Sequence, residues 1–315
     1  MSDAVTDLHA SVESFFASTF STDNAVITEA VKRMLAAGGK RLRPRVTLLA
    51  VDASGGNALG HLHLAAYMEL IHVATLIHDD VVDNASTRRG VNATAVDYGN
   101  RVSVLTGDYL FAWIFKNVTA NYPHPVPHVL SATLADICDG EVLQLQARGD
   151  LDLTLGAYVE IARRKTASLF AASAECGAIM GGTGPREIEG LRAFGDAFGV
   201  AFQMKDDLFD IVADERSLGK PVGNDLTERK VTIPLIEALA SGSGTFRDEV
   251  RRFYGGTTNE GIPAIVTGIE RQGGLAATRA HIARFVERAR MALEPIPPGP
   301  AKEELAKLAG ALLDE

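Results

Sequence analysis

The sequence is poor in cysteine, with two residues among 315. Cys138 and Cys176 lie far apart and lack the spacing of a metal site, and so few cysteines cannot form a disulfide framework. Hydrophobic residues make up 46% of the chain, which is enough for a sizeable buried core. Because so little cysteine fits a reducing compartment, we expect the protein in the cytoplasm.

Basic residues are also scarce. The 31 Lys and Arg residues are outnumbered by 40 Asp and Glu residues, which leaves a net charge of −9. A nucleic-acid-binding protein normally carries a basic surface, so we expect no nucleic-acid partner. Any anionic ligand must instead meet a local cluster of cations.

Long apolar runs are missing as well. The apolar stretch at 62–77 is interrupted by His63, Glu69 and His72, and it stays short of the roughly 20 apolar residues that a membrane span needs. Asp3 and Asp7 stand where a signal peptide would carry basic residues before an apolar run. We therefore expect a soluble protein without a secretion signal or a membrane span.

The sequence does show helical periodicity along most of its length. Apolar residues recur at intervals of three and four, and Ala, Leu, Glu and Arg are abundant. No linker is long or polar enough to mark a domain boundary, so we expect one all-α domain over residues 1–315. Helix breaks are predicted at Gly38–Gly39, Ser54–Gly56, Pro123–Pro127, Gly181–Pro185, Ser241–Gly244, Gly255–Gly256 and Pro295–Pro300.

The motif DDxxD occurs twice, at Asp79–Asp83 and at Asp206–Asp210, each time at the end of an apolar helical segment. The first and fifth aspartates of such a motif lie one turn apart on the same helix face, so each pair can grip a hard cation. Carboxylates this close repel each other, and oxygen ligands suit Mg²⁺ bridged to substrate phosphates. One such motif could equally be a solvated acidic helix end, but two on apolar helices favour metal sites.

Clusters of cations accompany both acidic motifs. Lys and Arg meet phosphate oxygens directly while Mg²⁺ bridges the remaining ones, so this combination predicts diphosphate sites. Each cation taken alone could be a solvated surface charge, and only the set as a whole supports the prediction. The clusters are Gly38–Pro44 (GGKRLRP), Arg88–Gly90, Lys165–Thr166, Gly219–Lys220 and Lys230.

The ordered set GGKRLRP, DDVVD, RRG, KT, FQMKDDLFD and GKPVGND resembles the trans-isoprenyl diphosphate synthases, or polyprenyl synthetase family, and its medium- and long-chain members in particular. The resemblance covers about Gly38 to Pro234. It implies the isoprenoid synthase fold, an antiparallel helix bundle around a deep central cavity with the two aspartate motifs facing each other, and a homodimer. It also implies a Mg²⁺-dependent polyprenyl synthetase domain, with three ions when substrate is bound, that joins an allylic diphosphate to isopentenyl diphosphate. Peripheral contact with a membrane for product release stays open.

The resemblance further implies roles for single residues. The metal ligands would be Asp79 and Asp83, with Asp80 in support, in the first motif, and Asp206, Asp207 and Asp210 in the second, with Asp206 the most direct ligand there. The isopentenyl diphosphate site would hold Lys40, Arg43, His72 and Arg89. The allylic diphosphate site would hold Arg88, Lys165, Thr166, Gln203, Lys220 and Lys230, of which Arg88, Lys165 and Lys220 would stabilise the leaving diphosphate.

Two of these assignments have alternatives. Arg229 stands where the family commonly has a glycine, so either Arg229 or Lys230 could reach the phosphate. His72 lies on an apolar helix and could instead be a core histidine with its hydrogen bonds satisfied.

Product length should depend on the helix that ends in Asp79. Positions on the face of the aspartates, at successive turns each about 5.4 Å deeper, would line the cavity for the growing tail. Short-chain members often carry a bulky aromatic residue one turn below the aspartates, whereas this chain has two small residues there. We expect an all-trans product of medium to long chain, roughly thirty to fifty carbons, with a short-chain geranylgeranyl or farnesyl diphosphate synthase as the alternative. The positions are Ala74 and Thr75, then Ile71, Met68 and Tyr67, where the last three could form either a floor or core packing.

Two other classes of protein would show different sequence patterns. A class I terpene cyclase would carry an Asn/Asp, Ser/Thr, Glu pattern as its second motif, and it would have no use for the cations at Gly38–Pro44 and Arg88–Gly90. A non-catalytic synthase subunit would usually have lost aspartates, whereas all six are present.

Overall fold

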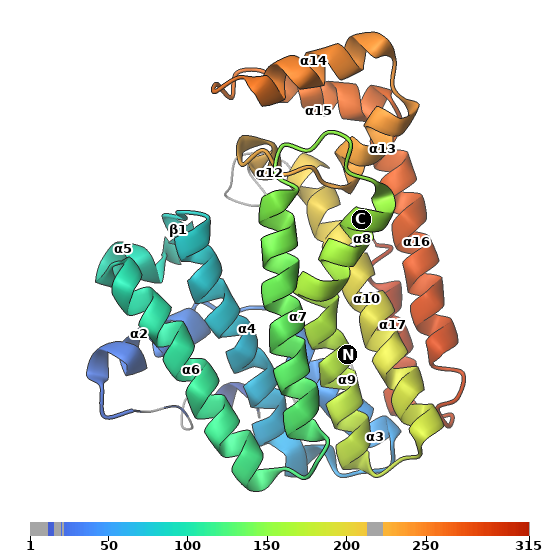
Figure 1. Ribbon diagram of the computed structural model, residues 1–315. Helices are drawn as coiled ribbons and strands as arrows, with labels where there is room; N and C mark the ends of the chain where they lie inside the picture. Colours follow the sequence, from blue (N-terminus) through green and yellow to red (C-terminus); the bar gives the residue numbers. More distant parts are fainter. Residues whose placement is uncertain (1–11, 16–19, 21, 213–222, 315) are drawn as a thin grey trace. The chain divides into compact units, whose positions relative to one another are not determined.

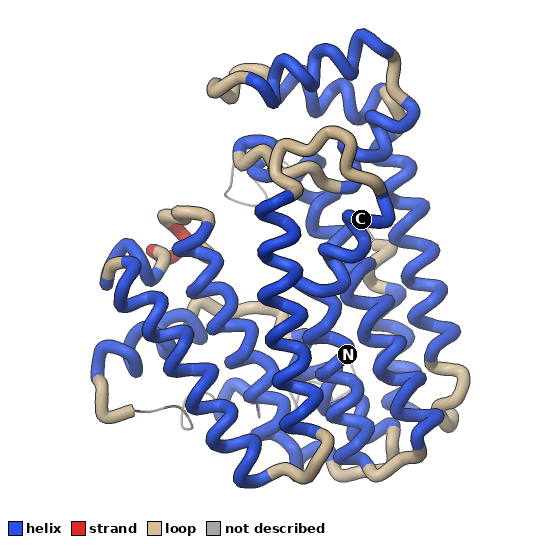
Figure 2. Tube along the Cα trace, in the orientation of Figure 1, coloured by secondary structure: helices blue, strands red, loops and turns tan. Residues whose placement is uncertain are grey.

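The computed structural model describes residues 12–15, 20, 22–212 and 223–314. Helices make up most of this part of the chain (Figures 1 and 2). The only strands among the described residues are β1 (Thr87–Arg88) and β2 (Val91–Asn92), which form one short antiparallel pair. The prediction of an all-α fold is confirmed.

The described residues group into two compact units. The first contains the segments up to Ser131, Ala172–Arg192 and Pro295–Glu303, and the second contains Ala132–Ala171, Ala193–Glu294 and the chain from Glu304. Four of the five divisions fall inside helices, and only the one between Glu294 and Pro295 lies in a connecting segment, which explains why no composition shift in the sequence marks them. These helices are α7 (Val126–Gln146), α9 (Ser168–Gly181), α10 (Pro185–Val212) and α17 (Pro300–Gly310).

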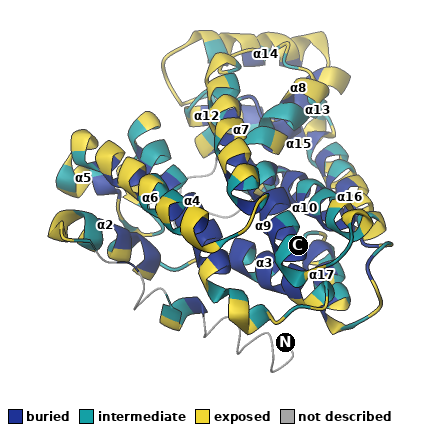
Figure 3. Cartoon of the chain, turned by 60° about the horizontal axis from the view of Figure 1, so that its bottom comes forward, coloured by how far each residue is buried: buried dark blue, intermediate teal, exposed yellow. Residues whose placement is uncertain are grey.

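The first unit is built around the long helix α4. Every residue from Leu64 to Ile71 is buried, because α3 and α6 pack against this helix from different sides. Burial all round explains the nearly continuous apolar sequence of α4, whereas α6 keeps an exposed face (Figure 3). The elements of this unit are α2 (Ala25–Ala36), α3 (Leu42–Ala53), η1 (Ala58–His61), α4 (Leu62–Val82), α5 (Thr94–Tyr98) and α6 (Asn100–Asn121), with β1 and β2.

The second unit depends on a close approach between α10 and the segment at 167–171. A Cβ atom on Gly199 would come within 2.4 Å of the Ala167 Cα, and one on Gly195 within 2.4 Å of the Phe170 carbonyl oxygen, so glycine is required at both places. Phe170 then packs edge-on against Phe198, with ring centroids 5.1 Å apart. The remaining elements are α8 (Leu155–Ala162), η2 (Arg163–Ala167), α12 (Asn224–Thr227), α13 (Ile233–Ser241), α14 (Gly244–Gly255), α15 (Ile262–Arg271) and α16 (Gly274–Ala292).

Each predicted break lies at helix ends, whereas the breaks after α4 and after α7 were not predicted. For example, α9 ends at Gly181 and α10 begins at Pro185, while α13 ends at Ser241 and α14 begins at Gly244. Proline suits the first turn of a helix because the N–H it lacks has no partner there in any case. Among the described helices, none combines the length and the apolar run needed to cross a membrane.

Candidate active site

The glycine-led turn of the first unit is tied to the RRG segment by Arg89. The Nη1 atom of Arg89 donates to the Gly38 carbonyl, and a Cβ atom on Gly39 would lie only 2.8 Å from that nitrogen. Gly38, with a φ of +78°, and Arg41, with a φ of 46°, both have left-handed backbones, which an arginine adopts only under constraint. The turn therefore depends on contacts that hold it in place.

Arg41 supplies these contacts, since it points into the protein. Its Nη1 donates to the Glu69 Oε1 at 2.9 Å, its Nε to the Glu13 Oε1 at 2.6 Å and its Nη2 to the Leu35 carbonyl at 2.6 Å. Arg41 and Glu69 are 3% and 2% exposed. Of the three cations in GGKRLRP, Arg41 is therefore structural, which the sequence pattern did not distinguish.

The structure brings Arg43, His72 and Arg89 close enough for their charges to interact, and Glu69 acts on both arginines. Burial lowers the pKa of Arg43 to about 10, with the charge of Glu69 opposing this shift and that of Arg89 adding to it. Burial, then Arg43 and the neighbouring arginines, lower the pKa of His72 well below its ordinary range. Charged guanidinium groups thus surround a neutral imidazole, a setting suited to an anion. Lys40, from the same turn, is exposed.

Within the first aspartate motif, the middle aspartate differs from its neighbours. Asp80 is fully buried, and its Oδ1 accepts hydrogen bonds from the Arg88 Nε at 2.7 Å and Nη2 at 2.5 Å. Asp79 and Asp83, at the end of α4, are only half-buried. The geometry therefore gives Asp80 the task of holding Arg88 and leaves the outer pair more accessible to a metal ion.

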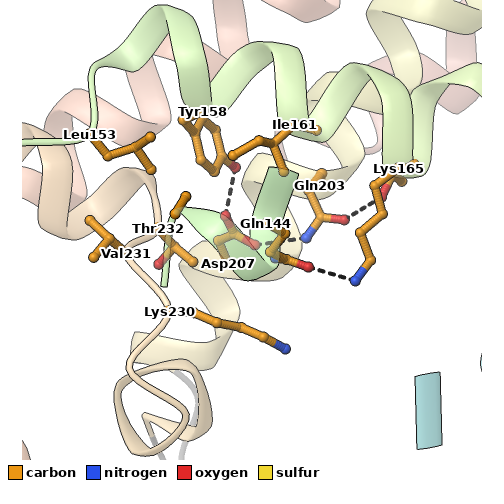
Figure 4. A pocket seen from close by; sticks show the side chains of 13 residues that line it. Gln144, Leu153, Tyr158, Ile161, Lys165, Gln203, Asp207, Lys230, Val231 and Thr232 are labelled. Carbon is orange, nitrogen blue, oxygen red and sulfur yellow. Dashed lines mark hydrogen bonds between the residues drawn. The ribbon is translucent and has the colours of Figure 1, made fainter. Parts of the chain in front are cut away.

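The second unit contains a pocket with an empty volume of about 440 Å³, part of it open to solvent (Figure 4). Five of the predicted site residues, from three segments of the chain, line this pocket. They are Lys165, Thr166, Gln203, Asp207 and Lys230.

A chain of hydrogen bonds runs along this pocket (Figure 4). Asp207 accepts from the Tyr158 Oη at 2.6 Å and from the Gln203 Nε2 at 2.8 Å. The Gln203 Oε1 in turn accepts from the Thr166 Oγ1 at 2.7 Å. The carboxylate of Asp207, like that of Asp80, thus accepts hydrogen bonds from neighbouring side chains.

Lys165 and Thr166 lie on η2, a π-helical turn inserted between α8 and α9. Such turns add a residue to a helix and are frequent at functional sites. The sequence predicted an unbroken helix here, because one extra residue leaves the apolar spacing on either side intact. Gly140 allows this turn to lie close to α7, since a Cβ atom at Gly140 would come within 2.4 Å of the backbone nitrogen of Lys165. Lys165 consequently pairs with Glu141 and donates to the Gln144 Oε1 at 2.6 Å.

Negative charge is concentrated around the second motif. Burial raises the pKa of Asp207 to about 7, an effect that its two hydrogen bonds oppose and the charges of Asp206 and Asp210 increase. Burial also raises the pKa of Asp210, whose carboxylate accepts the backbone N–H groups of Asn224 and Asp225 at 3.1 and 3.0 Å. Burial, with Asp207 and Asp210, raises the pKa of Asp225 as well. A bound cation would relieve this repulsion.

The donor set fits Mg²⁺ in a particular way. Within the described residues, no three His, Cys, Asp or Glu side chains converge as in a preformed metal cage. Mg²⁺ typically uses one or two carboxylates together with water and substrate phosphates, and it does not require such a cage. The half-buried Asp79 and Asp83 and the exposed Asp206 are suited to that mode of binding.

The structure separates the roles of Arg229 and Lys230. Lys230 lines the pocket and pairs with Glu228 at 2.6 Å, whereas the Arg229 side chain bonds to the turn at 256–259. Lys220 lies outside the described residues.

The five chain-length positions differ in exposure. Thr75 is half-buried, whereas Ala74, Ile71 and Met68 are fully buried and Tyr67 is 3% exposed. The Tyr67 ring packs edge-on against Trp113 and Tyr122, with centroids 5.8 and 6.3 Å away. Tyr67 therefore has a core-packing role, and Thr75 is the most accessible of the five.

Several residues of these sites were missed in the sequence. Glu141 and Gln144 gave no distinct signal, because α7 carries other polar residues as well, among them Ser131, Asp136 and Asp139. Asp225, the last residue of the GKPVGND segment, was not predicted as a site residue. Tyr158 gives no local signal, because its partner is distant in sequence, and Glu69 interrupts the apolar stretch at 62–77 without indicating its distant partner Arg41.

Replacing Glu69 should cost stability, because it leaves buried arginines without their carboxylate. We expect Glu69→Gln to lower the free energy of unfolding by about 3 to 5 kcal/mol, the usual effect of breaking a buried ion pair. Urea unfolding followed by circular dichroism measures this, with the exposed Glu29→Gln as the matched control. A loss below about 1 kcal/mol, the range of surface pairs, would contradict the structural role of Glu69.

Comparison with known proteins shows the family of the chain. Residues 24–267 match the model of the polyprenyl synthetase family. The octaprenyl diphosphate synthase of Escherichia coli is 37% identical over 289 residues, which cover 91% of this chain and 90% of that protein. The short chain isoprenyl diphosphate synthase of Methanothermobacter thermautotrophicus is 36% identical over 292 residues, again 91% and 90%.

Solved structures of polyprenyl synthases also match this chain. A decaprenyl diphosphate synthase from Rhodobacter capsulatus has a TM-score of 0.92 and 38% identity, covering 99% of this chain and 97% of that one. A polyprenyl synthase from Caulobacter crescentus, solved with calcium and isoprenyl diphosphate, has a TM-score of 0.93 and 35% identity, covering 99% and 96%. The chain therefore belongs to the polyprenyl synthetase family and has the isoprenoid synthase fold.

Proposed function

We propose that this chain is a Mg²⁺-dependent trans-prenyltransferase that condenses an allylic diphosphate with isopentenyl diphosphate to give an all-trans polyprenyl diphosphate. The observation that carries the proposal is the pocket of the second unit. Lys165, Thr166, Gln203 and Lys230 line it together with an aspartate of the second DDxxD motif. Cations and hydrogen-bond donors beside carboxylates are the environment that a metal-bridged diphosphate requires.

The reaction begins when the allylic C–O bond breaks and its electron pair leaves with the diphosphate. The double bond of isopentenyl diphosphate then attacks the allylic cation, a carbon–carbon bond forms, and a proton is lost to the departing diphosphate. Charge develops on the leaving group, so fixed cations stabilise the transition state more than the ground state. Lys165, Arg88 and Lys220 would supply this stabilisation, while Thr166, Gln203 and Lys230 hold the allylic diphosphate.

The cluster of Arg43, His72 and Arg89, with Lys40, would bind isopentenyl diphosphate. Its neutral imidazole can accept or donate a hydrogen bond without repelling the guanidinium groups. Holding the second substrate in this way converts a bimolecular encounter into an effectively intramolecular step.

Mg²⁺ would be held by the outer aspartates of both motifs, Asp79, Asp83, Asp206 and Asp210, as three ions once substrate is bound. When present, the ions neutralise the diphosphate as its charge increases. Asp80 and Asp207 would contribute by holding Arg88 and Gln203 in position.

We infer a medium- to long-chain product and a homodimer. One relative is named octaprenyl diphosphate synthase and another heptaprenyl diphosphate synthase component 2, whereas a geranylgeranyl diphosphate synthase of Methanosarcina mazei is 39% identical over 219 residues. Val104, Leu105 and Tyr109 are 41%, 62% and 37% exposed on α6, an apolar face suited to a second copy of the chain. We also propose that the enzyme acts in the cytoplasm.

Incubation of the purified chain with labelled isopentenyl diphosphate and each common allylic primer tests the proposal. We expect prenyl diphosphates of defined length, formed with Mg²⁺ and abolished by a chelator. Cyclised hydrocarbons would identify a terpene cyclase instead. If the chain alone gave no turnover with any primer, the proposed activity would be rejected in favour of a subunit that needs a partner.

Arg43→Ala should act mainly on the second substrate. Loss of a charge-assisted hydrogen bond costs about 1.5 to 3 kcal/mol, so the apparent KM for isopentenyl diphosphate should rise roughly 10- to 100-fold. Initial-rate kinetics with each substrate varied in turn measure this, and Arg101→Ala on the exposed surface of α6 is the control. An equal effect on both substrates, or an effect on the allylic one alone, would overturn the division between the two sites.

A further inference from the structure

Arg229 occupies a backbone position that favours glycine. Its φ is 58°, in the left-handed region that arginine rarely adopts. The family resemblance places a glycine here, so this chain keeps the backbone shape while adding a long charged side chain. A strained position persists when surrounding contacts fix it, and these contacts indicate what the side chain does.

The guanidinium group of Arg229 connects its own turn to the turn between α14 and α15. Within its own turn, Nη1 donates to the Leu226 carbonyl at 2.9 Å. In addition, its Cζ lies 4.2 Å from the centroid of the Phe253 ring, on α14. Across the two turns it donates to the Asn259 Oδ1 at 3.0 Å and to the carbonyls of Thr258 at 3.0 Å and Gly256 at 3.2 Å.

The main chain of residues 229–230 is also hydrogen-bonded to other segments. The Tyr254 Oη donates to the Lys230 carbonyl at 2.8 Å, and the Gly149 N–H donates to the Arg229 carbonyl at 2.9 Å. The Lys230 N–H donates to the Asp225 carbonyl at 2.8 Å. Residues 229–230 are therefore the point where the loop after α7, the α14–α15 hairpin and the segment after the second motif meet.

The place where these segments meet adjoins the pocket, because Lys230 lines the pocket together with Ala147 and Leu153 of the loop after α7. We infer that Arg229 is a positioning residue that clamps the α14–α15 hairpin to the segment carrying Lys230, and so fixes the Lys230 ammonium group in the allylic diphosphate pocket. The inference rests on the proposed function of that pocket. It gives the hairpin, which carries none of the sequence motifs, a part in substrate binding.

The planar guanidinium group explains how Arg229 can hold the α14–α15 hairpin. Its five N–H donors lie in fixed directions, and they meet several carbonyl oxygens of the facing turn at once. A lysine would keep the charge and lose the fork. A glycine would relieve the backbone and lose the clamp.

A double-mutant cycle tests the clamp through substrate binding. Arg229→Gly should raise the apparent KM for the allylic diphosphate about tenfold and leave that for isopentenyl diphosphate within about twofold. Arg229→Lys should recover less than half of the loss. If Arg229 acts through Lys230, the variant Arg229→Gly with Lys230→Ala should be no worse than Lys230→Ala alone. Additive effects, or an unchanged allylic KM in Arg229→Gly, would overturn the inference, and Arg251→Ala on exposed α14 is the control.

Hydrogen exchange in the ligand-free protein provides a measurement that does not depend on activity. Amides at 228–231 and 256–259 should exchange at least about tenfold faster in Arg229→Gly, whereas those of α6 should keep their wild-type rates. Unchanged exchange at both segments would reject the clamp. A wild-type protein without turnover would reject the proposed function, while the exchange result would still decide whether Arg229 joins the two segments.

Discussion

Asp79→Ala and Asp206→Ala should each reduce turnover about a hundred- to a thousandfold while leaving a folded helical protein. Each substitution removes a carboxylate that would hold Mg²⁺ against the leaving diphosphate, and the loss of such a stabilising group costs about 3 to 4 kcal/mol of barrier. Neither residue is deeply buried, and alanine favours helix more than aspartate does, so stability should change little. Single-turnover rates at saturating Mg²⁺, together with circular dichroism, measure both expectations.

The middle aspartates provide a contrast within the same motifs. Asp80→Ala should lower stability as well as rate, because Arg88 loses a fully buried partner. Asp248→Ala, on the exposed surface of α14, is the matched control and should leave both unchanged. Near wild-type turnover in Asp79→Ala or Asp206→Ala would show that the metal ligands lie elsewhere.

This difference between outer and middle aspartates marks the limit of what the sequence could predict. Helical periodicity, the helix breaks and the positions of both DDxxD motifs at helix ends were predictable, because each depends on residues close together in the chain. The sequence treated all six aspartates as metal ligands. Whether one of them faces a metal or an arginine depends on a partner from another segment, as for Asp80 and Arg88.

The dependence on partners from other segments also explains why the sequence did not distinguish Arg41 from Arg43. Arg41 and Arg43 are two residues apart in one turn, and the sequence pattern treats them alike. The buried Glu69 and the Leu35 carbonyl draw Arg41 inward, while Arg43 lies beside Arg89 and His72. Long-range contacts decide between a structural and a substrate-binding cation, and local spacing contains no information about them.

The exposure of the chain-length positions identifies which one to test. Ala74 is fully buried, so a phenylalanine there would overpack the core and cost about 1 to 3 kcal/mol of stability before any tail met it. Thr75 is half-buried, one turn below Asp79, and its hydroxyl donates to the His72 carbonyl at 2.8 Å. A larger side chain at Thr75 is therefore less restricted by core packing than one at Ala74.

Thr75→Phe should shorten the product sharply, from the expected medium to long chain to a short one, while the first condensations continue. The added ring would stand where the tail must pass, about 5.4 Å below the aspartates, and it does not touch the groups that ionise the primer. Chain-length analysis of labelled products measures the effect. Thr75→Val is the matched control, because it keeps the volume, loses only the hydroxyl and should leave the product length unchanged. If Thr75→Phe made full-length product at the wild-type rate, the tail would not pass this face of α4, and product length would have to be set by other residues.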